Sequence, residues 1–417
     1  MSKLDELIRE LCPEGVEYKT LGEIGKFYGG LTGKSKKDFE DGNEVFITYK
    51  NVYSNPALDI YPNDKVKIAD GEKQRTLEYG DIVFTGSSET PDECGFSSVV
   101  TRKPNRKLYL NSFCFFFRLN NPKVLLPDFS KHLFRSSELR YQIGKTASGV
   151  TRYNVSKDKM TKIKIPIPPL KIQREISGML DILVQQEQEL IKLLIKEKTL
   201  RRKQFDCSLR ELMELSTEKY SLGEIIDFNN GFAFKSSEFK DEGVPVIRIA
   251  NIQDGTIDIN GMVCIRKDGH YQNMERYKAY PGDILIAMSG ATTGKIGVNT
   301  TQKVFYINQR VGKIEPNEMF VQKQYLYYLL NYYSGEIIKT ARGTGAQPNL
   351  SSEKLKKIRV KIPNKREQER ISSILMQLEN ECKGLVKKID FEISMRKKQS
   401  EYYQSILLNI QEKSASL

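Results

Sequence analysis

Apolar residues follow a coiled-coil spacing in a long central stretch, from residue 168 to about residue 215. Successive apolar positions lie four, three, seven and four residues apart, and one polar residue, Glu187, fills the remaining turn. This spacing places one narrow apolar stripe along a helix, as in a coiled-coil seam. The stripe consists of Ile176, Leu180, Leu183, Leu190 and Leu194. The pattern therefore predicts one long helix here.

The same stripe returns 195 residues later and predicts a second long helix near the C-terminus. Its positions are Ile371, Leu375, Leu378, Cys382, Leu385 and Ile389. The flanking residues repeat at the same offset, with Pro168 matched by Pro363 and Gln173 matched by Gln368. Two helices that share one seam spacing indicate a coiled coil within a duplicated chain.

The segments before the two long helices repeat as well. The sequence Leu21–Ile24 returns at Leu222–Ile225, and Gly80-Asp81-Ile82 returns at Gly282-Asp283-Ile284. A Tyr-x-Asn pattern at Tyr109 is found again at Tyr306. The offset drifts from 201 to 195 along the domain, so insertions and deletions should lie in its loops.

Each repeated segment has the alternation of a mixed domain. In the first copy, strand-like runs cover 44–52, 81–85, 98–102, 113–119 and 163–167, and a helix is predicted over 127–145. We expect an α+β protein with two duplicated mixed α/β domains, separated by a pair of long coiled-coil helices. The expected segments are 1–19, a helix completing the coil; 20–170, domain 1; 171–216, the central helix; 217–365, domain 2; and 366–413, the C-terminal helix.

A short amphipathic helix is predicted at the N-terminus. Its end, Ile8–Leu11, matches Leu209–Leu212 at the end of the central helix. Because the C-terminal helix runs out near Ile410, we expect the N-terminal helix to supply the missing piece, with Leu4, Leu7, Ile8 and Leu11 packing near Ile406 and Leu407. This closure would give a pseudo-twofold, circular organisation.

Charge and cysteine usage narrow the function. The chain of 417 residues has a net charge of +13, which favours a polyanion such as nucleic acid as partner. Its six cysteines form no Cys-x-x-Cys pair and it has two histidines, so we expect no metal site and no disulfide framework. No apolar run reaches the ~20 residues of a membrane span. We expect a cytoplasmic protein without a membrane partner.

Two glycine-rich stretches are similar to phosphate-binding loops. A P-loop has four residues between its glycines, whereas Gly29 and Gly33, and Gly290 and Gly294, are separated by three. We therefore expect no nucleotide hydrolysis. A loop that contacts DNA phosphates fits better, with an ordinary solvated loop as the alternative. The lysines concerned are Lys34, Lys36, Lys37 and Lys295.

The sequence contains no catalytic constellation. Neither histidine stands near a repeated Ser, Cys or Asp, and no glycine-rich cofactor turn or Asn/Asp-Pro-Pro-aromatic motif of an adenine methyltransferase is present. The aromatic residues of 325–333 are interpreted as core or partner surface, with a base-stacking platform as the alternative, and those of 115–117 as core. The chain is therefore not expected to be an enzyme.

The duplicated frame resembles the specificity subunit of a Type I restriction-modification system. The resemblance is carried by the runs Gly231–Phe239, Gly282–Ile286, Gly343–Ser351 and Glu367–Ile371, and their first-half counterparts extend it over nearly the whole chain. It implies two target-recognition domains, held apart by a pair of antiparallel helices in a pseudo-twofold circular organisation, that each read one half of a bipartite double-stranded DNA target. It also implies docking of two methyltransferase subunits and of endonuclease/translocase subunits. S-adenosylmethionine, ATP and Mg would be bound by those partners, with no cofactor in this chain.

Polar side chains on the domain loops are the candidates for base contacts, since Arg, Asn, Gln and Lys match base edges in the major groove. The first-domain candidates are Thr151, Arg152 and Asn154, and the second-domain candidates are Lys235, Arg248, Thr292, Lys295, Gln347 and Asn349. Two alternatives remain. One is a fused, self-sufficient methyltransferase or nuclease, and the other is a repeat-built protein that binds acidic partners instead of DNA.

Overall fold

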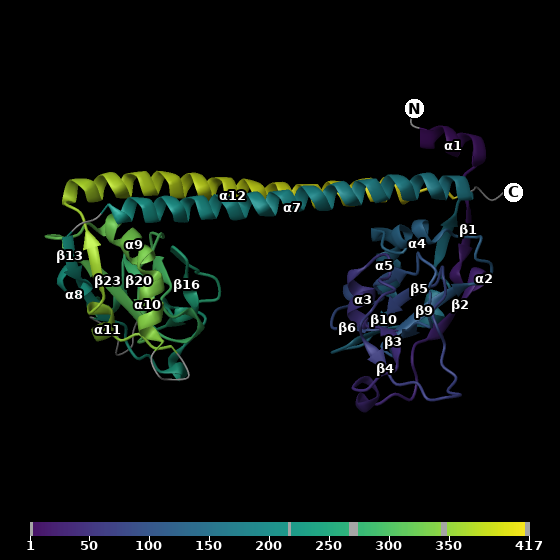
Figure 1. Ribbon diagram of the computed structural model, residues 1–417, viewed down its shortest axis with the longest axis horizontal. Coiled ribbons are helices and arrows are strands. Elements are labelled where there is room, and N and C mark those ends of the chain that lie inside the picture. Colours follow the sequence, from purple (N-terminus) through teal and green to yellow (C-terminus); the bar gives the residue numbers. More distant parts are fainter. Residues whose placement is uncertain (1–2, 216–217, 267–273, 343–347, 413–417) are drawn as a thin grey trace. The chain divides into compact units, whose positions relative to one another are not determined.

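The computed structural model describes residues 3–215, 218–266, 274–342 and 348–412. It divides into two compact units (Figure 1). The first contains Met1–Leu194 and Phe391–Leu417, and the second contains Ile195–Asp390. Each unit therefore holds one globular domain together with one half of each long helix, α7 (Leu170–Glu214) and α12 (Lys365–Leu408).

The first domain alternates short strands and helices. In chain order, with the N-terminal helix first, its elements are α1 (Lys3–Leu11), β1 (Glu17–Thr20), α2 (Leu21–Ile24), β2 (Gly25–Gly29), η1 (Lys36–Phe39), β3 (Glu44–Ile47), α3 (Tyr49–Ser54), β4 (Lys65–Val66), β5 (Ile82–Thr85), β6 (Ser87–Ser88), η2 (Pro91–Glu93), β7 (Ser97–Val99), β8 (Tyr109–Leu110), β9 (Cys114–Leu119), α4 (Pro127–Leu133), α5 (Ser137–Lys145), β10 (Ala147–Ser148), β11 (Tyr153–Val155), α6 (Lys157–Met160) and β12 (Lys164–Ile167).

The second domain follows the same order with a few extra strands. Its elements are β13 (Glu218–Ser221), α8 (Leu222–Ile225), β14 (Ile226–Asn230), η3 (Ser236–Glu238), β15 (Val244–Ile247), η4 (Ile249–Asn251), β16 (Ile252–Gln253), β17 (Thr256–Ile257), β18 (Val263–Ile265), η5 (Glu275–Tyr277), β19 (Lys278–Ala279), β20 (Ile284–Ala287), η6 (Gly290–Thr292), β21 (Ile296–Val298), β22 (Phe305–Ile307), β23 (Val311–Pro316), α9 (Lys323–Tyr332), α10 (Ser334–Ala341), α11 (Ser352–Lys356) and β24 (Arg359–Ile362).

The predicted duplication is confirmed by the strand order. The antiparallel sheet β2-β9-β5-β7 of the first domain corresponds to β14-β23-β20-β21 of the second. A parallel pair, β3 with β8 or β15 with β22, lies in a second sheet of each domain. The strand that leads into each long helix pairs with the first strand of its domain, β1 with β12 and β13 with β24.

In each domain, residues of the main sheet and of the helices that follow it in the chain form one hydrophobic core. The aromatic strand β9 is fully buried at Phe115, Phe116 and Phe117, and α9 buries Tyr325 and Tyr328, so the prediction that these residues form core is confirmed. In Figure 1, α4 and α5 lie between the first main sheet and α7. Apolar residues of α7 therefore belong to the same core as the domain that precedes it.

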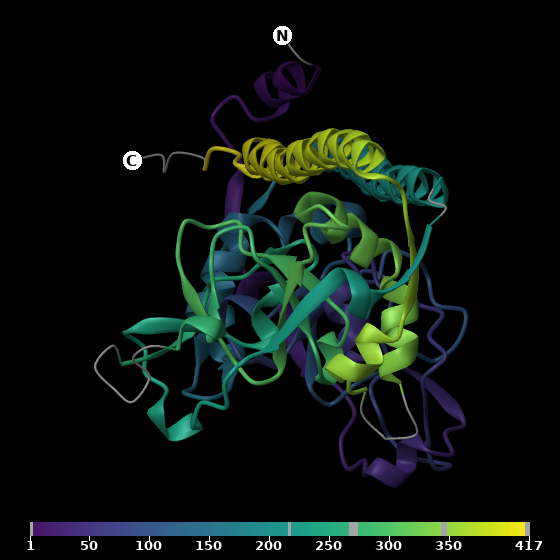
Figure 2. The same ribbon diagram turned by 90° about the vertical axis from the view of Figure 1, so that its left-hand side faces the viewer.

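The two long helices run antiparallel within each unit, seen end-on in Figure 2. In the second unit, Lys198 of α7 pairs with Asp390 of α12 at 2.6 Å. Further along α7, Leu209 and Met213 share a core with residues near the start of α12. Later residues of one helix thus meet earlier residues of the other.

The predicted seam is correct at the domain ends and shifts in the middle. Ile176 and Leu180 of α7, and Ile371 and Leu375 of α12, are fully buried. Leu385, expected in the seam, is instead 39% exposed. The next residue, Val386, is half-buried in its place and restores the four-three step from Cys382 to Ile389.

The N-terminal helix packs on the end of α12, as predicted, but for another reason. The helix α12 has 44 residues against 45 in α7, so no turns are missing and that expectation was wrong. At the positions where α7 carries Phe205 and Leu209, α12 has the polar Ser400 and Gln404. The helix α1 supplies the apolar side chains that this end of α12 lacks.

The contacts of α1 agree in part with the predicted ones, since Leu7, Ile8 and Leu407 pack against the same core as Leu4. Leu4 is 6% exposed and shares a core with Leu408, whereas Ile406, expected at this contact, is 51% exposed. Leu11 lies on the outer side and is 36% exposed. Main-chain pairing completes the junction, since the Val16 amide donates to the Gln411 carbonyl at 2.9 Å.

Two secondary-structure expectations were wrong. The strand predicted over 44–52 ends at Ile47, because Thr48 caps α3 by accepting a hydrogen bond from the Asn51 amide at 3.3 Å. The helix predicted over 127–145 is two helices. Ser136 caps the second by accepting from the Leu139 amide at 3.4 Å. Among the described residues, no helix is long and apolar enough to cross a membrane, and no three His, Cys, Asp or Glu residues cluster as metal ligands.

Candidate nucleic-acid interface

One serine–asparagine pair marks the same strand edge in both domains. In the first domain Ser87 of β6 lies opposite Asn154 of β11 in an antiparallel pairing. In the second domain Ser289, just after β20, forms an antiparallel bridge with Asn349. The edge follows the central strand of the main sheet in each case, so the repeat preserves its backbone.

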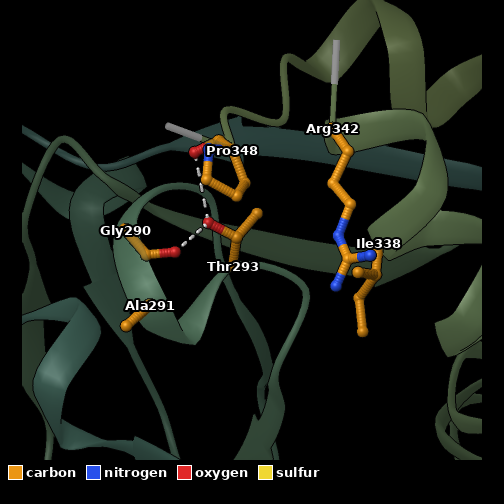
Figure 3. Close-up of a pocket in the computed structure, with 6 residues that line it drawn as sticks. All are labelled: Gly290, Ala291, Thr293, Ile338, Arg342 and Pro348. Carbon is orange, nitrogen blue, oxygen red and sulfur yellow. Dashed lines mark hydrogen bonds between the residues drawn. The ribbon is translucent and has the colours of Figure 1, made fainter. Parts of the chain in front are cut away.

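A second feature of this edge is a side-chain hydrogen bond that joins the neighbouring turn to the strand beside it. The Thr293 hydroxyl donates to the carbonyls of Gly290, at 2.7 Å, and Pro348, at 3.3 Å (Figure 3). At the equivalent place the Cys94 thiol donates to the Tyr153 carbonyl at 3.2 Å. Burial raises the pKa of the Cys94 thiol above its ordinary value, which keeps it protonated as a donor.

A three-residue turn adjoins this edge in both domains and is called the tip here: Asn111–Phe113 in the first domain and Asn308–Arg310 in the second. The Phe113 carbonyl accepts from the Gly86 amide at 2.8 Å, and the Arg310 carbonyl accepts from the Met288 amide at 2.9 Å. Each tip is thus hydrogen-bonded to the strand edge that carries the serine.

The main chain that crosses each tip approaches it too closely for a side chain. A Cβ atom on Gly30 would lie 2.2 Å from the Asn111 carbonyl oxygen, and one on Gly231 would lie 2.2 Å from the Asn308 carbonyl oxygen. Glycine is therefore required at both crossings. Both tips are therefore in close contact with the main chain of the segment that crosses them.

Aromatic and acidic side chains line the first-domain cleft, which has a volume of about 530 Å³. Its lining residues are Tyr49, Tyr53, Ser87, Ser88, Glu89, Glu93, Phe113, Thr151 and Arg152. Glu93 accepts from the Ser88 hydroxyl at 3.1 Å and from the Tyr53 hydroxyl at 3.3 Å. A carboxylate held in this way can accept from the amino groups of cytosine or adenine.

Two half-buried arginines fix the loop that forms one wall of this cleft. Arg140 donates to the carbonyls of Asp92 and Cys94 at 2.6 and 2.7 Å. Arg135 donates to the Ser97 carbonyl at 2.7 Å, and burial lowers its pKa to about 10. Both guanidinium groups are occupied by protein acceptors, so they support the cleft and are not available to DNA.

The second-domain cleft is lined by different side chains on the same backbone. Its volume is about 470 Å³, and it is lined by Met288, Ser289, Gln309, Arg310, Pro348 and Asn349. A smaller hollow of about 290 Å³ lies across Pro348, with Arg342 and Ile338 on its far wall (Figure 3). None of the described residues that line the second-domain cleft is acidic, in contrast to the first-domain cleft.

The first-domain candidates separate into two groups. Thr151 and Arg152 line the cleft, and Asn154 is exposed beside them. The Arg152 guanidinium donates to the Ser87 hydroxyl at 3.0 Å and lies 5.6 Å from the Phe113 ring centroid. The structure therefore brings this group together at the strand edge.

The candidate lysines of 34–37 lie on the other side of the first tip. Lys36 lines a hollow of about 810 Å³ that shares Phe113 with the cleft, and Lys37 is exposed next to it. The Lys34 ammonium lies 2.6 Å from Glu72, with its side chain 9% exposed. Its hydrogen bond lowers the pKa of Glu72 to about 2. Lys34 is thus engaged in an ion pair, which argues against a phosphate contact.

In the second domain, Asn349 lines the cleft and Lys295 is half-buried on the neighbouring turn. The Thr292 hydroxyl donates to the Ile249 carbonyl at 3.2 Å and so braces this turn. Arg248 follows β15, and its Nε is buried without a hydrogen-bond partner among the described residues. Lys235 is exposed on the segment that crosses the second tip. Gln347 lies outside the described residues.

The sequence interpretation missed an exposed residue of each cleft. Phe113 and Arg310 lie two residues after the asparagine of the repeated Tyr-x-Asn pattern. The Tyr-x-Asn pattern itself is the same in both copies, whereas the residue two positions after its asparagine differs between them. Glu89 and Glu93 were not predicted, because a net charge of +13 indicates contacts between cationic side chains and a polyanion.

Comparison with known proteins agrees with the duplicated fold. The chain matches the family described as Type I restriction modification DNA specificity domain twice, over residues 13–198 and 215–395. The MjaVIII type I restriction enzyme specificity subunit of Methanocaldococcus jannaschii is 28% identical over 271 residues, which are 60% of this chain and 63% of that protein. The matched part thus covers less than two thirds of this relative. The putative specificity subunit S.HindORF215P of Haemophilus influenzae is 29% identical over 63% of this chain and 68% of its own length.

Two solved structures have a similar fold. One is a chain from a study of the structural basis of complex assembly and conformational transition of the type I R-M system. Its TM-score is 0.75 at 18% sequence identity, and the match covers 95% of this chain and 98% of that one. The crystal structure of the HsdS subunit from Thermoanaerobacter tengcongensis gives a TM-score of 0.55 at 19% identity, covering 95% and 97%. With two family matches that together cover most of its length, this chain belongs to the Type I restriction-modification DNA specificity domain family.

Proposed function

We propose that this chain is the DNA-recognition subunit of a type I restriction-modification complex and that it reads a bipartite, asymmetric double-stranded DNA target. Each domain reads one half-site through the cleft beside its tip. The chain carries no catalysis of its own. Two methyltransferase subunits and the endonuclease/translocase subunits assemble on it and bring S-adenosylmethionine, ATP and Mg.

The observation that carries this proposal is the pair of equivalent strand edges. Ser87 opposite Asn154 and Ser289 opposite Asn349 have the same backbone pairing, and the residues around them differ in charge and shape. Acidic and aromatic groups surround the first edge, and an arginine and two amides surround the second. One fold presented twice with different polar groups is suited to two different base sequences.

The charge of the chain supports DNA as the polyanion. A net charge of +13 favours association with the phosphate backbone, in a manner that weakens steeply with salt. Exposed cations lie near both clefts, such as Lys36 and Lys37 in the first domain and Arg342 in the second. They are suited to phosphate contacts that position the domains without reading bases.

The proposal is tested by exchanging residues 21–165 with the same segment of a relative. Methylated adenines are then mapped by sequencing the host genome. We expect the first half-site to change, with the second half-site and the spacer as before. The reciprocal exchange of residues 222–360 is the matched control and should change only the other half-site. A change in both half-sites from one exchange would contradict the modular mechanism.

A second experiment separates the proposal from a fused methyltransferase. The isolated chain is titrated with S-adenosylmethionine in a calorimeter, and the complex with its methyltransferase subunits is titrated in parallel. We expect heat only from the complex. Binding by the isolated chain, or methylation of DNA by it alone, would favour the fused enzyme.

A further inference from the structure

We propose that the third residue of each tip is a specificity-determining residue and that the two tips use different chemistry. Arg310 donates two hydrogen bonds to O6 and N7 of a guanine in the second half-site. Phe113 packs on the methyl group of a thymine in the first half-site. This inference rests on the proposed function and extends it to individual bases.

The first step is that the two residues occupy the same position. Both carbonyls accept from the residue that precedes the edge serine, at 2.8 Å for Phe113 and 2.9 Å for Arg310. Each follows an asparagine whose amide donates to the end of the neighbouring parallel strand, to Ile47 at 3.0 Å or Ile247 at 2.9 Å. If the third residue of one tip contacts a base, the third residue of the other tip is therefore in the equivalent position to do so.

The second step concerns Phe113, a residue that is 58% exposed although hydrogen bonds fix its backbone. Its amide donates to the Asn111 side chain at 2.8 Å. Phe113 lines two hollows, the cleft that also contains Arg152 and the hollow that also contains Lys36. An apolar group that shares these hollows with two cationic side chains fits a polyanion that offers an apolar contact, and the thymine methyl group provides one in the major groove.

The third step concerns Arg310, which is exposed and makes no side-chain hydrogen bond or ion pair with the described residues. Other arginines of the chain are engaged, such as Arg118, whose guanidinium contacts Asp81 at 2.6 Å. Among the residues of this cleft that the structure describes, none has a carboxylate that could compete for Arg310. Its planar fork of donors matches the two acceptors of guanine.

Position within the cleft favours a base over a phosphate as the group that Arg310 contacts. Arg310 lines the cleft together with Gln309, Ser289 and Asn349, whose amide and hydroxyl groups also suit base edges. Arg342 lines the separate hollow across Pro348 and is better placed for the backbone of the DNA. A phosphate contact by Arg310 is an outcome that the experiment recognises.

The experiment uses the full chain purified with its methyltransferase subunits and a DNA library randomised over both half-sites. Arg310→Ala should lose the preference for guanine at one position of the second half-site by about 5- to 150-fold. Phe113→Arg should gain a guanine preference at one position of the first half-site. Arg359→Ala is the matched control, because Arg359 is exposed on β24 in the same domain, and it should leave all preferences unchanged.

Three outcomes overturn the inference. One is an equal loss of affinity for every sequence in Arg310→Ala, with a salt slope reduced by about one, which identifies a phosphate contact. Another is a changed preference in the half-site of the other domain. The third is unchanged base preferences in both tip variants, while the unaltered complex selects two defined half-sites. If the unaltered complex selects no defined sequence, the proposed function itself fails.

Discussion

Gln173 and Gln368 make the same three hydrogen bonds at the starts of the two long helices. The Gln173 side chain accepts from the Leu126 amide at 2.7 Å and donates to the carbonyls of Val124 and Pro168 at 2.9 and 2.8 Å. Gln368 accepts from Gln322 at 2.9 Å and donates to Phe320 and Pro363 at 2.8 and 2.9 Å. Both side chains are buried, so each glutamine fixes its helix to the preceding domain.

Replacing Gln173 by Leu should therefore lower the free energy of unfolding of the first unit. The change leaves one amide and two carbonyls without the partner they have now, and a buried unsatisfied group costs about 1–3 kcal/mol. We expect a total loss of at least about 2 kcal/mol, measured by chemical denaturation of the full chain. Gln186→Leu is the control, since Gln186 is exposed on the same helix. Equal stability of the two variants would refute the anchoring role.

Acid should destabilise the contact between α4 and α7. His132 Nε2 lies 2.7 Å from Asp181 Oδ1, and Lys131 also contacts this carboxylate, at 2.8 Å. Burial lowers the pKa of His132 below its ordinary value of 6.5, despite the opposing effect of Asp181. The unfolded chain then binds more protons than the folded one, so stability falls as the pH drops through 6.5.

The substitution His132→Gln should flatten this pH dependence, because glutamine does not titrate. The free energy of unfolding is measured between about pH 7 and pH 5, where an unperturbed histidine titrates. The chain has two histidines, so His270→Gln is the control. A slope that disappears in the His270 variant and persists in the His132 variant would contradict the assignment.

The N-terminal helix should stabilise the end of α12. Leu4→Ala removes a side chain that is 6% exposed, and truncation of a buried leucine costs about 2–5 kcal/mol. We expect a lower melting temperature of the first unit by circular dichroism. Leu11→Ala removes a side chain that is 36% exposed and should have a much smaller effect. Identical melting of both variants would show that α1 contributes nothing there.

The length of the helix pair should set the spacer between the half-sites. Inserting four residues after Leu194 and four after Ile389 lengthens both helices by about 6 Å with little rotation of the seam. Each base pair rises about 3.4 Å, so we expect one extra spacer pair and at most about two. Methylome sequencing gives the result. A two-residue insertion at both sites turns the seam away and should abolish methylation. An unchanged spacer after the four-residue insertions would show that the helix pair does not set the distance between the half-sites.

The long-range frame was predictable because it depends on local periodicity and on repetition. The stretch 168–215 predicted α7, which spans Leu170–Glu214, and the repeat predicted α12 at the same offset. Helix ends within the domains were less predictable. A single capping side chain, such as Thr48 or Ser136, redirects a chain whose apolar pattern alone would continue.

Half of the candidate site escaped prediction because it depends on contacts distant in sequence. The partner of Lys34 is Glu72, 38 residues away, and no local pattern links them. The tips become recognisable only when Phe113 and Arg310 are seen beside equivalent strand edges. Thr151, Arg152 and Asn154 directly follow the repeated serine–glycine loop and lie together at one edge, and their contact with bases stays a prediction.

The close backbone approach at Gly30 and Gly231 has a consequence for how such a chain changes over generations. The tips are held by main-chain atoms, so substitution of Phe113 or Arg310 alters what the molecule recognises without removing a contact that keeps it folded. Mutational drift toward a new recognition sequence can then proceed one amino acid at a time through stable intermediates. The two glycines themselves have no such freedom, since any side chain there would collide with the tip.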